Sequence, residues 1–246
     1  MEIKTLLRWL PFQRPKSLVA KSQNNETEIL NEIIEWGPIS RTFLEFGFHP
    51  HEFNCCGLTN TCEGILIDGN PANVRKARGL LPANVRCYAR FLDLEAMRWI
   101  QDLWAGKKLG VLSVDVDGND YWFLKELIPM RPDVVICEYN ASLGQRKITV
   151  PYKKEFRRML EHPSGWYHGA SLPALETLAA SHGYSLVAVD SGGTNAFFIP
   201  AEKCPDKKLR KSGEVYLENK FRNQLSGTTA EEQWQMIRTC PWVEVA

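Results

Sequence analysis

The stretch GVLSVDVDGNDYW, residues 110–122, decides which fold the sequence predicts. Its apolar run, residues 111–114, is short, rich in valine and bounded by glycine, which is typical of a strand buried on both faces. Acidic and amide side chains follow directly, and a helical pattern then continues to Leu127. A buried strand that leads through a polar turn into a helix is the unit from which parallel α/β sheets are built.

The same alternation of strands and helices runs along most of the chain. Strands are expected at residues 41–48, 64–68, 85–89, 111–115, 134–138, 184–189 and 195–199, and helices at 27–36, 71–81, 94–104, 152–161 and 171–182. Residues 52–62 fit either a helix or an irregular turn. Only residues 190–194 join the last two strands, so we expect a hairpin and an antiparallel final strand. The pattern predicts a Rossmann-like, doubly wound, mostly parallel sheet covered by helices on both faces.

The composition is that of an ordinary soluble globular protein with one α/β domain. The chain has 246 residues, of which 44% are hydrophobic and 24% charged. A net charge of +1 provides no electrostatic basis for binding nucleic acid. No apolar run approaches the ~20 residues that a membrane span needs. Seven cysteines without paired CxxC spacing, and no secretory leader, favour a cytoplasmic location.

We divide the chain into three parts. They are an N-terminal arm at residues 1–25, the α/β domain at 26–200 and a helical appendage at 201–246. Residues 6–12 of the arm are amphipathic, so this segment either packs on its own domain or a partner, or contacts a membrane surface. A homodimer is compatible with this organisation.

Ligands of open parallel sheets bind beyond the carboxyl ends of the strands, so polar residues there are the candidates for a site. They are Glu45 and Gly47 after the first strand, Asp68, Gly69 and Asn70 after the second, Asp93 beyond the third, residues 115–120 after the fourth and residues 138–140 after the fifth. Asp68 follows Glu45 at close to the ~20-residue offset of a carboxylate that accepts hydrogen bonds from ribose hydroxyls. Each of these acids has an alternative role as a helix cap, above all Asp93.

Five of these blocks in order resemble class I S-adenosylmethionine-dependent methyltransferases, and the nearest branch resembles the FkbM-like group of polysaccharide and natural-product biosynthesis. The blocks are Glu45-Phe-Gly47, residues 67–70, residues 113–122, residues 138–141 and residues 193–198. The resemblance implies a seven-stranded sheet with an antiparallel last strand and S-adenosylmethionine as cofactor. It also implies that Glu45 and Gly47 approach the methionine part, Asp68 the ribose, Asp93 or its backbone neighbours the adenine, and Asp115 the transferable methyl group.

One block departs from the family pattern. Such loops usually carry three alternating glycines, but only Gly47 remains here, and His49 and His51 occupy the later positions. S-adenosylmethionine has no pyrophosphate, so it demands less close approach of the backbone than a dinucleotide. We therefore expect cofactor binding to persist. Three alternatives stay open for the two rings. They pack over the cofactor or hold the loop, or one of them hydrogen-bonds to cofactor or substrate. The third alternative is that cofactor binding is lost.

Methyl transfer to a hydroxyl requires alignment, exclusion of water and removal of a proton. Asp115, Glu138 and Asn140 are the candidates, and they loosely resemble the ligands of cation-dependent O-methyltransferases. Oxygen ligands suit Mg²⁺ or Ca²⁺, so a divalent cation is an open alternative, but binding of the cofactor amine and loop capping are the favoured roles. His168, next to two aromatic residues, is the candidate base among the histidines.

The predicted activity is methylation of a small molecule or sugar, on oxygen. Two alternatives stay open: transfer of another alkyl group from the same cofactor, or a cofactor-binding module without catalysis. The expected partner is a small-molecule acceptor, not nucleic acid.

Overall fold

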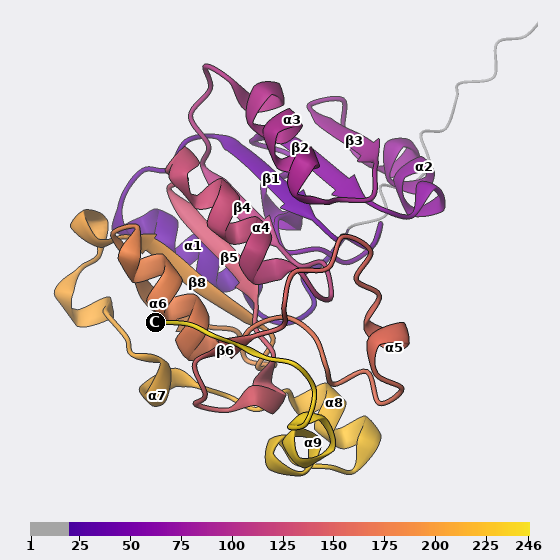
Figure 1. Ribbon diagram of the computed structural model, residues 1–246. Helices are drawn as coiled ribbons and strands as arrows, with labels where there is room; N and C mark the ends of the chain where they lie inside the picture. The colour runs from indigo at the N-terminus through magenta and orange to yellow at the C-terminus, as the bar shows by residue number, and fades with distance from the viewer. Residues whose placement is uncertain (1–19) are drawn as a thin grey trace, which may run out of the picture.

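A seven-stranded sheet forms the centre of the protein (Figure 1). The computed structural model describes residues 20–246, so the amphipathic segment at residues 6–12 and most of the predicted arm lie outside the described residues. The strands are β1 (Thr42–Phe46), β2 (Glu63–Asp68), β3 (Val85–Ala89), β4 (Val111–Val114), β5 (Val134–Glu138), β7 (Tyr184–Val189) and β8 (Asn195–Pro200).

The order of these strands is β3-β2-β1-β4-β5-β8-β7. The first five run parallel, whereas β8 is antiparallel to both β5 and β7. The predicted sheet, including its antiparallel last strand, is therefore confirmed. The chain leaves β1 toward β2 and β3 and then returns to place β4 on the other side of β1, so the topological switch point lies between β1 and β4.

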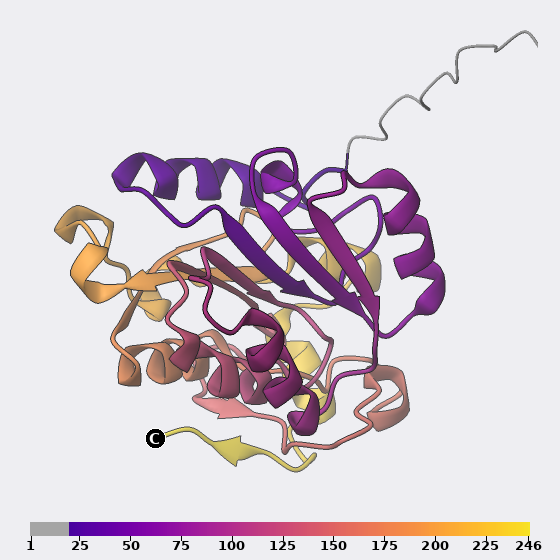
Figure 2. The same ribbon diagram turned by 90° about the horizontal axis from the view of Figure 1, so that it is seen from above.

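Helices cover the sheet on both faces (Figure 2). α1 (Glu26–Trp36) and α2 (Pro71–Leu80) pack on one face, and α3 (Leu94–Trp104), α4 (Asp120–Leu127) and α6 (Leu172–Ser181) pack on the other. The apolar stripe of α3, which includes Met97 and Ile100, is buried as its spacing predicts. Asn70, Asp93 and Ser171 cap α2, α3 and α6 with their side chains.

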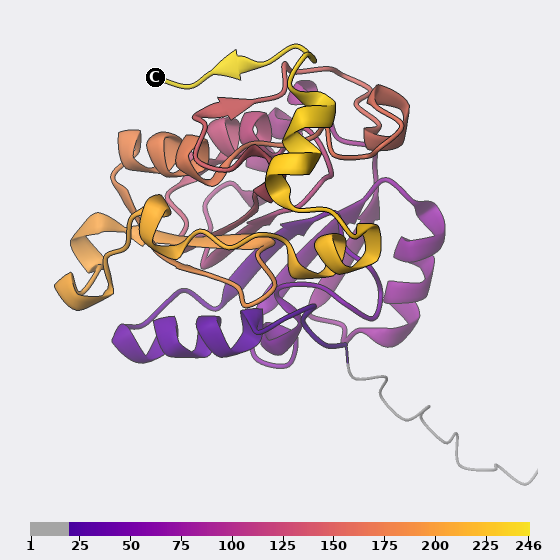
Figure 3. The ribbon, with the colours of Figure 1, turned by 90° about the horizontal axis from the view of Figure 1, so that it is seen from below.

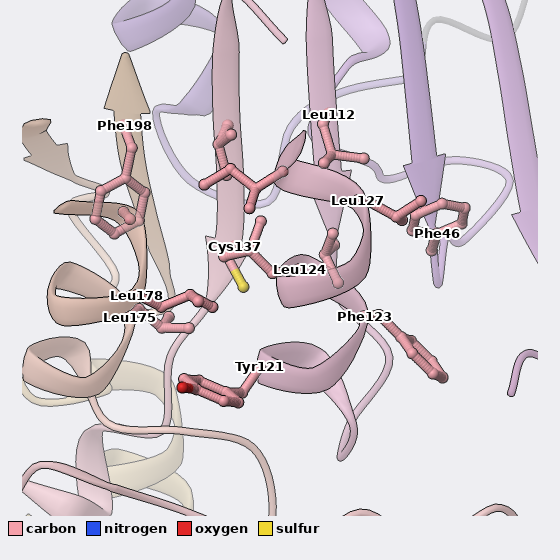
Figure 4. Close-up of a cluster of buried hydrophobic side chains, with 14 of the residues drawn as sticks. Phe46, Leu112, Tyr121, Phe123, Leu124, Leu127, Cys137, Leu175, Leu178 and Phe198 are labelled. Carbon is pink, nitrogen blue, oxygen red and sulfur yellow. The ribbon is translucent and has the colours of Figure 1, made fainter. Parts of the chain in front are cut away.

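The larger core lies between the sheet and α4 and α6 (Figure 4). Leu124 and Leu127 of α4 and Leu175 of α6 are fully buried, as is Phe198 of β8. Truncating such a leucine to alanine costs about 2–5 kcal/mol, because the cavity left behind collapses only in part. This packing fixes α4, and with it the acidic turn that precedes α4.

Three predicted elements differ from those observed by more than one residue at an end. β1 ends at Phe46 because Gly47 turns into the left-handed region, at φ 69°. Only the 3₁₀ turn Cys56–Leu58 is helical within 52–62. α5 is confined to Arg158–Glu161. Before it, the Lys153 carbonyl accepts from the Phe156 amide and from the Asn119 side chain, so the chain forms a turn there and no helix.

The C-terminal part packs along the domain and is not wholly helical (Figure 3). It contains α7 (Ser212–Val215), α8 (Lys220–Ser226), α9 (Ala230–Ile237) and the short strand β9 (Val243–Glu244). β9 pairs antiparallel with β6 (Ile148–Thr149), which the sequence pattern does not predict. Further 3₁₀ turns are Ile128–Met130, Ala141–Leu143, Ala201–Lys203 and Asp206–Lys208. Between residues 20 and 246, no helix combines the length and the apolar character that crossing a bilayer requires.

Candidate active site

Two adjoining cavities lie at the carboxyl ends of the parallel strands. The first has a volume of about 340 Å³ and extends toward the ends of β2 and β3, and the second, of about 640 Å³, extends toward β5 and α8. They share the lining residues Gly47, His49, Asp115 and Asp117. Because Gly47 follows β1 and Asp115 follows β4, the two cavities meet at the switch point, where ligands of this architecture bind. We call the pair the crevice.

Gly47 is required by the closeness of two backbone segments. Its φ of 69° is unfavourable for other residues, and a Cβ atom at this position would lie 1.4 Å from the Asp115 carbonyl oxygen. The Gly47 amide also donates to the Ile67 carbonyl at 3.0 Å. This glycine therefore sets the spacing between β1 and β4 at the floor of the crevice.

Glu45 holds the loop that follows β1. Its buried carboxylate accepts hydrogen bonds from the backbone N–H groups of Asn54 and Cys55, each at 2.8 Å. Burial raises the pKa of Glu45 to about 7, although these two hydrogen bonds act in the opposite direction. Glu45 borders the second cavity, but both of its carboxylate oxygens are hydrogen-bonded to amides of the loop. Its observed role is therefore to position the loop.

The two histidines of that loop do not need the freedom of glycine. Among residues 20–246, the non-glycine residues with positive φ are Asp117 and Arg131, so His49 and His51 adopt ordinary backbone angles. Their ring centroids lie 5.6 Å apart, and the exposed His49 borders both cavities without filling them.

The first cavity is bordered by Asp68, Gly69 and an exposed aromatic ring. The Asp68 carboxylate accepts from the Asn70 amide at 2.7 Å, and its partial burial raises its pKa. Asn70 therefore orients Asp68 and caps α2, and it does not itself line the first cavity. Phe91 is 50% exposed at the edge of the cavity, where an apolar face is available to a flat ring.

Asp93 lies outside the lining of both cavities. Its carboxylate caps α3 by accepting from the Ala96 amide at 2.8 Å, and it pairs with Lys154 at 3.1 Å. Its neighbours Phe91 and Leu92 border the first cavity instead. The alternative role of this residue as a helix cap is thus the one that the structure displays.

Four carboxylates gather where the cavities meet. They belong to Asp115, Asp117, Asp120 and Glu138. Asp120 closes the turn after β4, because its two oxygens accept from the Val116 and Gly118 amides at 2.7 and 2.9 Å. Burial raises the pKa of Asp120 to about 8, and burial together with the neighbouring Glu138 raises the pKa of Asp115 well above its usual value. Within residues 20–246, the Asp115 carboxylate has no hydrogen-bond partner.

Glu138 is linked to His168 through Arg222 of α8. Arg222 donates to Glu138 Oε1 at 2.8 Å and contacts His168 Nε2 at 2.9 Å. A guanidinium only donates, so Nε2 accepts and Nδ1 carries the proton. Burial, together with the charges of Arg158 and Arg222, keeps the pKa of His168 well below its usual value, so the ring is neutral. Nδ1 then faces Glu138 Oε2 across 3.9 Å.

Asn140 and the aromatic pair before His168 have structural contacts. Asn140 is 1% exposed, donates to the Trp166 and His168 carbonyls at 2.7 and 2.9 Å, and accepts from the Ser142 amide. Tyr167 packs against aromatic rings and donates to a carbonyl of the C-terminal segment at 2.7 Å. Asn140 and His168 do not line either cavity. Of the three candidate residues at these strand ends, the structure thus brings Asp115 and Glu138 together at the crevice, whereas Asn140 lies away from it.

Several lining residues are not among those predicted from the sequence. Arg90 and Phe91 lie directly after β3, so the strand-end rule applied to that strand would have found them. Phe221 and Arg222 come from α8, in the appendage beyond the family-like blocks. Only the three-dimensional path of the chain brings α8 to the crevice, so no local signal marked these two residues.

Comparisons with known proteins give matches in structure only. No family model matches the chain, and no curated protein matches it. Similar solved structures include the N-terminal domain of EvdMO1 with SAH bound (12% identity, 71% of this chain and 79% of that chain, TM-score 0.44). They also include SAM-bound CalS10, an amino pentose methyltransferase from Micromonospora echinaspora (12%, 76% and 93%, 0.44), and a TehB-like SAM-dependent methyltransferase from Corynebacterium glutamicum (11%, 72% and 88%, 0.41).

The protein thus has a Rossmann-like α/β fold with a crevice at the switch point of its sheet. Beside the shared acids Asp115 and Asp117, the first cavity adds Asp68, Arg90 and the exposed ring of Phe91. The second cavity adds further acids, several amide side chains and Arg222. This arrangement suits a nucleoside in the first half and a polar molecule in the second.

Proposed function

We propose that the protein is an S-adenosylmethionine-dependent methyltransferase that methylates an oxygen of a small molecule or sugar. The observation that carries this proposal is the position of Asp68 and Asp115 at the ends of β2 and β4, on either side of Gly47, in one continuous crevice. The family-like sequence blocks support the FkbM-like branch and polysaccharide or natural-product biosynthesis as the finer parts of the proposal. The seven cysteines without paired CxxC spacing support a cytoplasmic location.

The residues of the crevice fit this cofactor. Asp68, held by the Asn70 amide, would accept hydrogen bonds from the ribose hydroxyls. Phe91 would contact the adenine face. Gly47 has no side chain and borders both cavities beside the end of β1, where the methionine part would lie. The acids at the junction would face the positive charges of the cofactor, which are its sulfonium and its ammonium group.

The chain's contribution to the reaction is alignment and proton removal. Bound S-adenosylmethionine supplies a methyl group on a positively charged sulfur. The acceptor oxygen forms the new bond to this carbon, and the electron pair of the broken carbon–sulfur bond stays on sulfur. Asp115 borders both cavities and would take the hydroxyl proton; its raised pKa makes it a stronger base than an exposed aspartate. Arg222 and Phe221 border the acceptor side, where a bound acceptor would lie against them.

Calorimetry with S-adenosylhomocysteine tests the cofactor half of the proposal. We expect one site per chain, and an Asp68→Ala variant that binds at least about tenfold more weakly, the equivalent of about 1.4 kcal/mol. Asp102→Ala, which removes an exposed acid of α3 away from the crevice, is the matched control and should bind normally. A chain that binds no S-adenosylhomocysteine would refute the proposal.

Incubation with methyl-labelled cofactor and pools of hydroxylated metabolites tests the chemistry. We expect label in a product that resists mild base, as an ether does, together with S-adenosylhomocysteine. Release of methylthioadenosine instead would identify transfer of the aminobutyrate arm. Binding without turnover on any pool would favour the module without catalysis.

A further inference from the structure

Exposed apolar side chains gather around the mouth of the crevice. Within residues 20–246, seven large apolar side chains are exposed, and five of them lie at or next to the crevice. Phe91 lines the first cavity and Phe221 the second, and Leu225 follows Phe221 by one turn of α8. Met159 and Leu160 belong to α5. Single exposed apolar residues are ordinary, but a group of them at one place marks a contact surface. We call these five side chains the apolar rim.

Ion pairs with acids of the crevice place α5 and α8 beside it. Arg158 of α5 donates to Asp117, which lines both cavities, at 2.8 Å. Arg222 of α8 donates to Glu138, which lines the second cavity, at 2.8 Å. In all three views the two helices lie at the end of the molecule toward which the parallel strands point (Figures 1, 2 and 3). The apolar rim therefore occupies one end of the molecule.

Basic side chains lie among the residues of the apolar rim. Arg157 directly precedes α5 and Lys220 begins α8, and both are exposed. The exposed Lys76 of α2 is close enough to His51, in the loop beside the crevice, for its charge to help lower the pKa of that histidine. Within residues 20–246, no acid pairs with any of these three cations. Their charges are thus available to an anionic partner.

The acids of the crevice lie deeper than these cations. Asp120 and Glu138 are buried and Asp115 is half-buried, while the exposed Asp117 is paired with Arg158. The interior of the crevice is therefore acidic, whereas its mouth is basic and apolar. A surface with this arrangement attracts a large anionic partner to the mouth and leaves the interior to a different ligand.

A lipid surface suits this pattern better than a second copy of the chain. Stable interfaces between proteins bury about 1,200–2,000 Å² and have a contiguous apolar centre. Here the exposed apolar side chains come from separate segments, with two largely polar cavities between them. Separate apolar side chains can each enter the headgroup region of a bilayer, while basic residues beside them face the lipid phosphates.

The N-terminal part of the chain joins the described part at the same place. Lys21 pairs through its backbone with the loop after β1, and Asn24 lines the second cavity. Residues 1–19 lie outside the described residues, but their sequence contains four basic residues and one acid, besides the amphipathic segment 6–12. A basic amphipathic sequence attached at this point favours the membrane alternative for that segment.

We propose that the mouth of the crevice docks on the surface of an anionic lipid bilayer. The apolar side chains of α5 and α8 enter the headgroup region, and Lys76, Arg157 and Lys220 contact lipid phosphates. The protein lies on the bilayer in this arrangement. The contact goes beyond the proposed function and does not depend on it.

Flotation of the whole chain with lipid vesicles tests the contact. We expect binding to vesicles of phosphatidylcholine mixed with phosphatidylglycerol, and at least about tenfold weaker binding to phosphatidylcholine alone. Added salt should weaken the binding, because it screens the cations. Leu160→Ser and Leu225→Ser should each weaken it at least about fivefold, since these side chains leave water on docking. They are 76% and 77% exposed, so neither change should alter the folded structure.

Leu209→Ser is the matched control, because it removes an exposed leucine at the other end of the molecule. Leu209 follows Lys208, whose ammonium lies 5.0 Å from the ring centre of Trp36, near the start of the first strand. This variant should bind the vesicles like the wild-type chain.

The proposal is overturned if the wild-type chain does not float with the anionic vesicles, or if all three leucine variants bind them alike. Self-association in sedimentation velocity that Leu225→Ser disperses, without vesicle binding, would instead identify the apolar rim as a dimer face. Binding of S-adenosylhomocysteine is measured separately by calorimetry, so this proposal and the proposed function fail separately.

Discussion

Replacing Gly47 with alanine should destabilise the protein far more than the same change at another left-handed glycine. At Gly47 the new Cβ would lie 1.4 Å from the Asp115 carbonyl oxygen, and φ is 69°. A Cβ needs about 3.3 Å or more from an oxygen, so the segments after β1 and β4 must separate by about 2 Å. The conformational cost is about 1–2 kcal/mol, and forced separation of packed backbone adds about 2–3 kcal/mol. We expect a total loss of about 3–5 kcal/mol.

Gly227 provides the control. It has the same φ of 69°, and nothing lies within 4 Å of the point where a Cβ atom would be, so Gly227→Ala should lose only the conformational cost of about 1–2 kcal/mol. Urea unfolding of both variants, with comparison of their midpoints and slopes, measures the difference. Equal losses for the two variants would refute the argument that backbone contact, and not φ alone, requires glycine at position 47.

Two further predictions concern the buried polar groups. Arg222→Ala should lower the free energy of unfolding by about 1.5–3 kcal/mol, because it leaves Glu138 and His168 without their donor, whereas Arg222→Lys keeps the charge and should lose less. Urea unfolding measures this loss. Unchanged imidazole ¹⁵N chemical shifts of His168 in Arg222→Ala would contradict the assigned tautomer. Burial raises the pKa of Glu45 from 4.5 to about 7, so the folded state holds this proton more tightly than the unfolded state and the free energy of unfolding should fall as pH rises from about 4.5 to 7. Glu45→Gln should make this pH profile flatter, and an unchanged slope would show that Glu45 is not its source.

The sheet was predictable because its strands carry their own signals. The run at residues 111–114 is fully buried, as its composition indicates, and the short link at 190–194 makes the antiparallel hairpin. Asp190 stabilises that link by accepting from the amides of Gly192, Thr194 and Asn195, a local pattern available to an aspartate in a tight turn.

The site was only partly predictable, because strand ends can be located from sequence while side-chain partners cannot. Asp68, Asp115 and Glu138 lie in the crevice as the strand-end rule predicts. Asn140 follows the same rule but turns inward to satisfy backbone carbonyls, so its amide is occupied. Arg222 is distant in sequence and reaches Glu138 only because the C-terminal segment folds back over the domain.

The loop after β1 accommodates histidine at positions 49 and 51 because only position 47 requires glycine there. Position 47 alone must adopt a left-handed angle against the backbone of β4, and it keeps its glycine. Beyond it the chain turns away from that contact, and Glu45 takes over the fixing of the loop through the amides of Asn54 and Cys55. A buried carboxylate that binds two amides can hold one conformation, so His49 and His51 need no positive φ. The side chains of positions 49 and 51 are therefore free to vary, and at position 49 the imidazole borders both cavities, where a glycine would offer no group to a ligand.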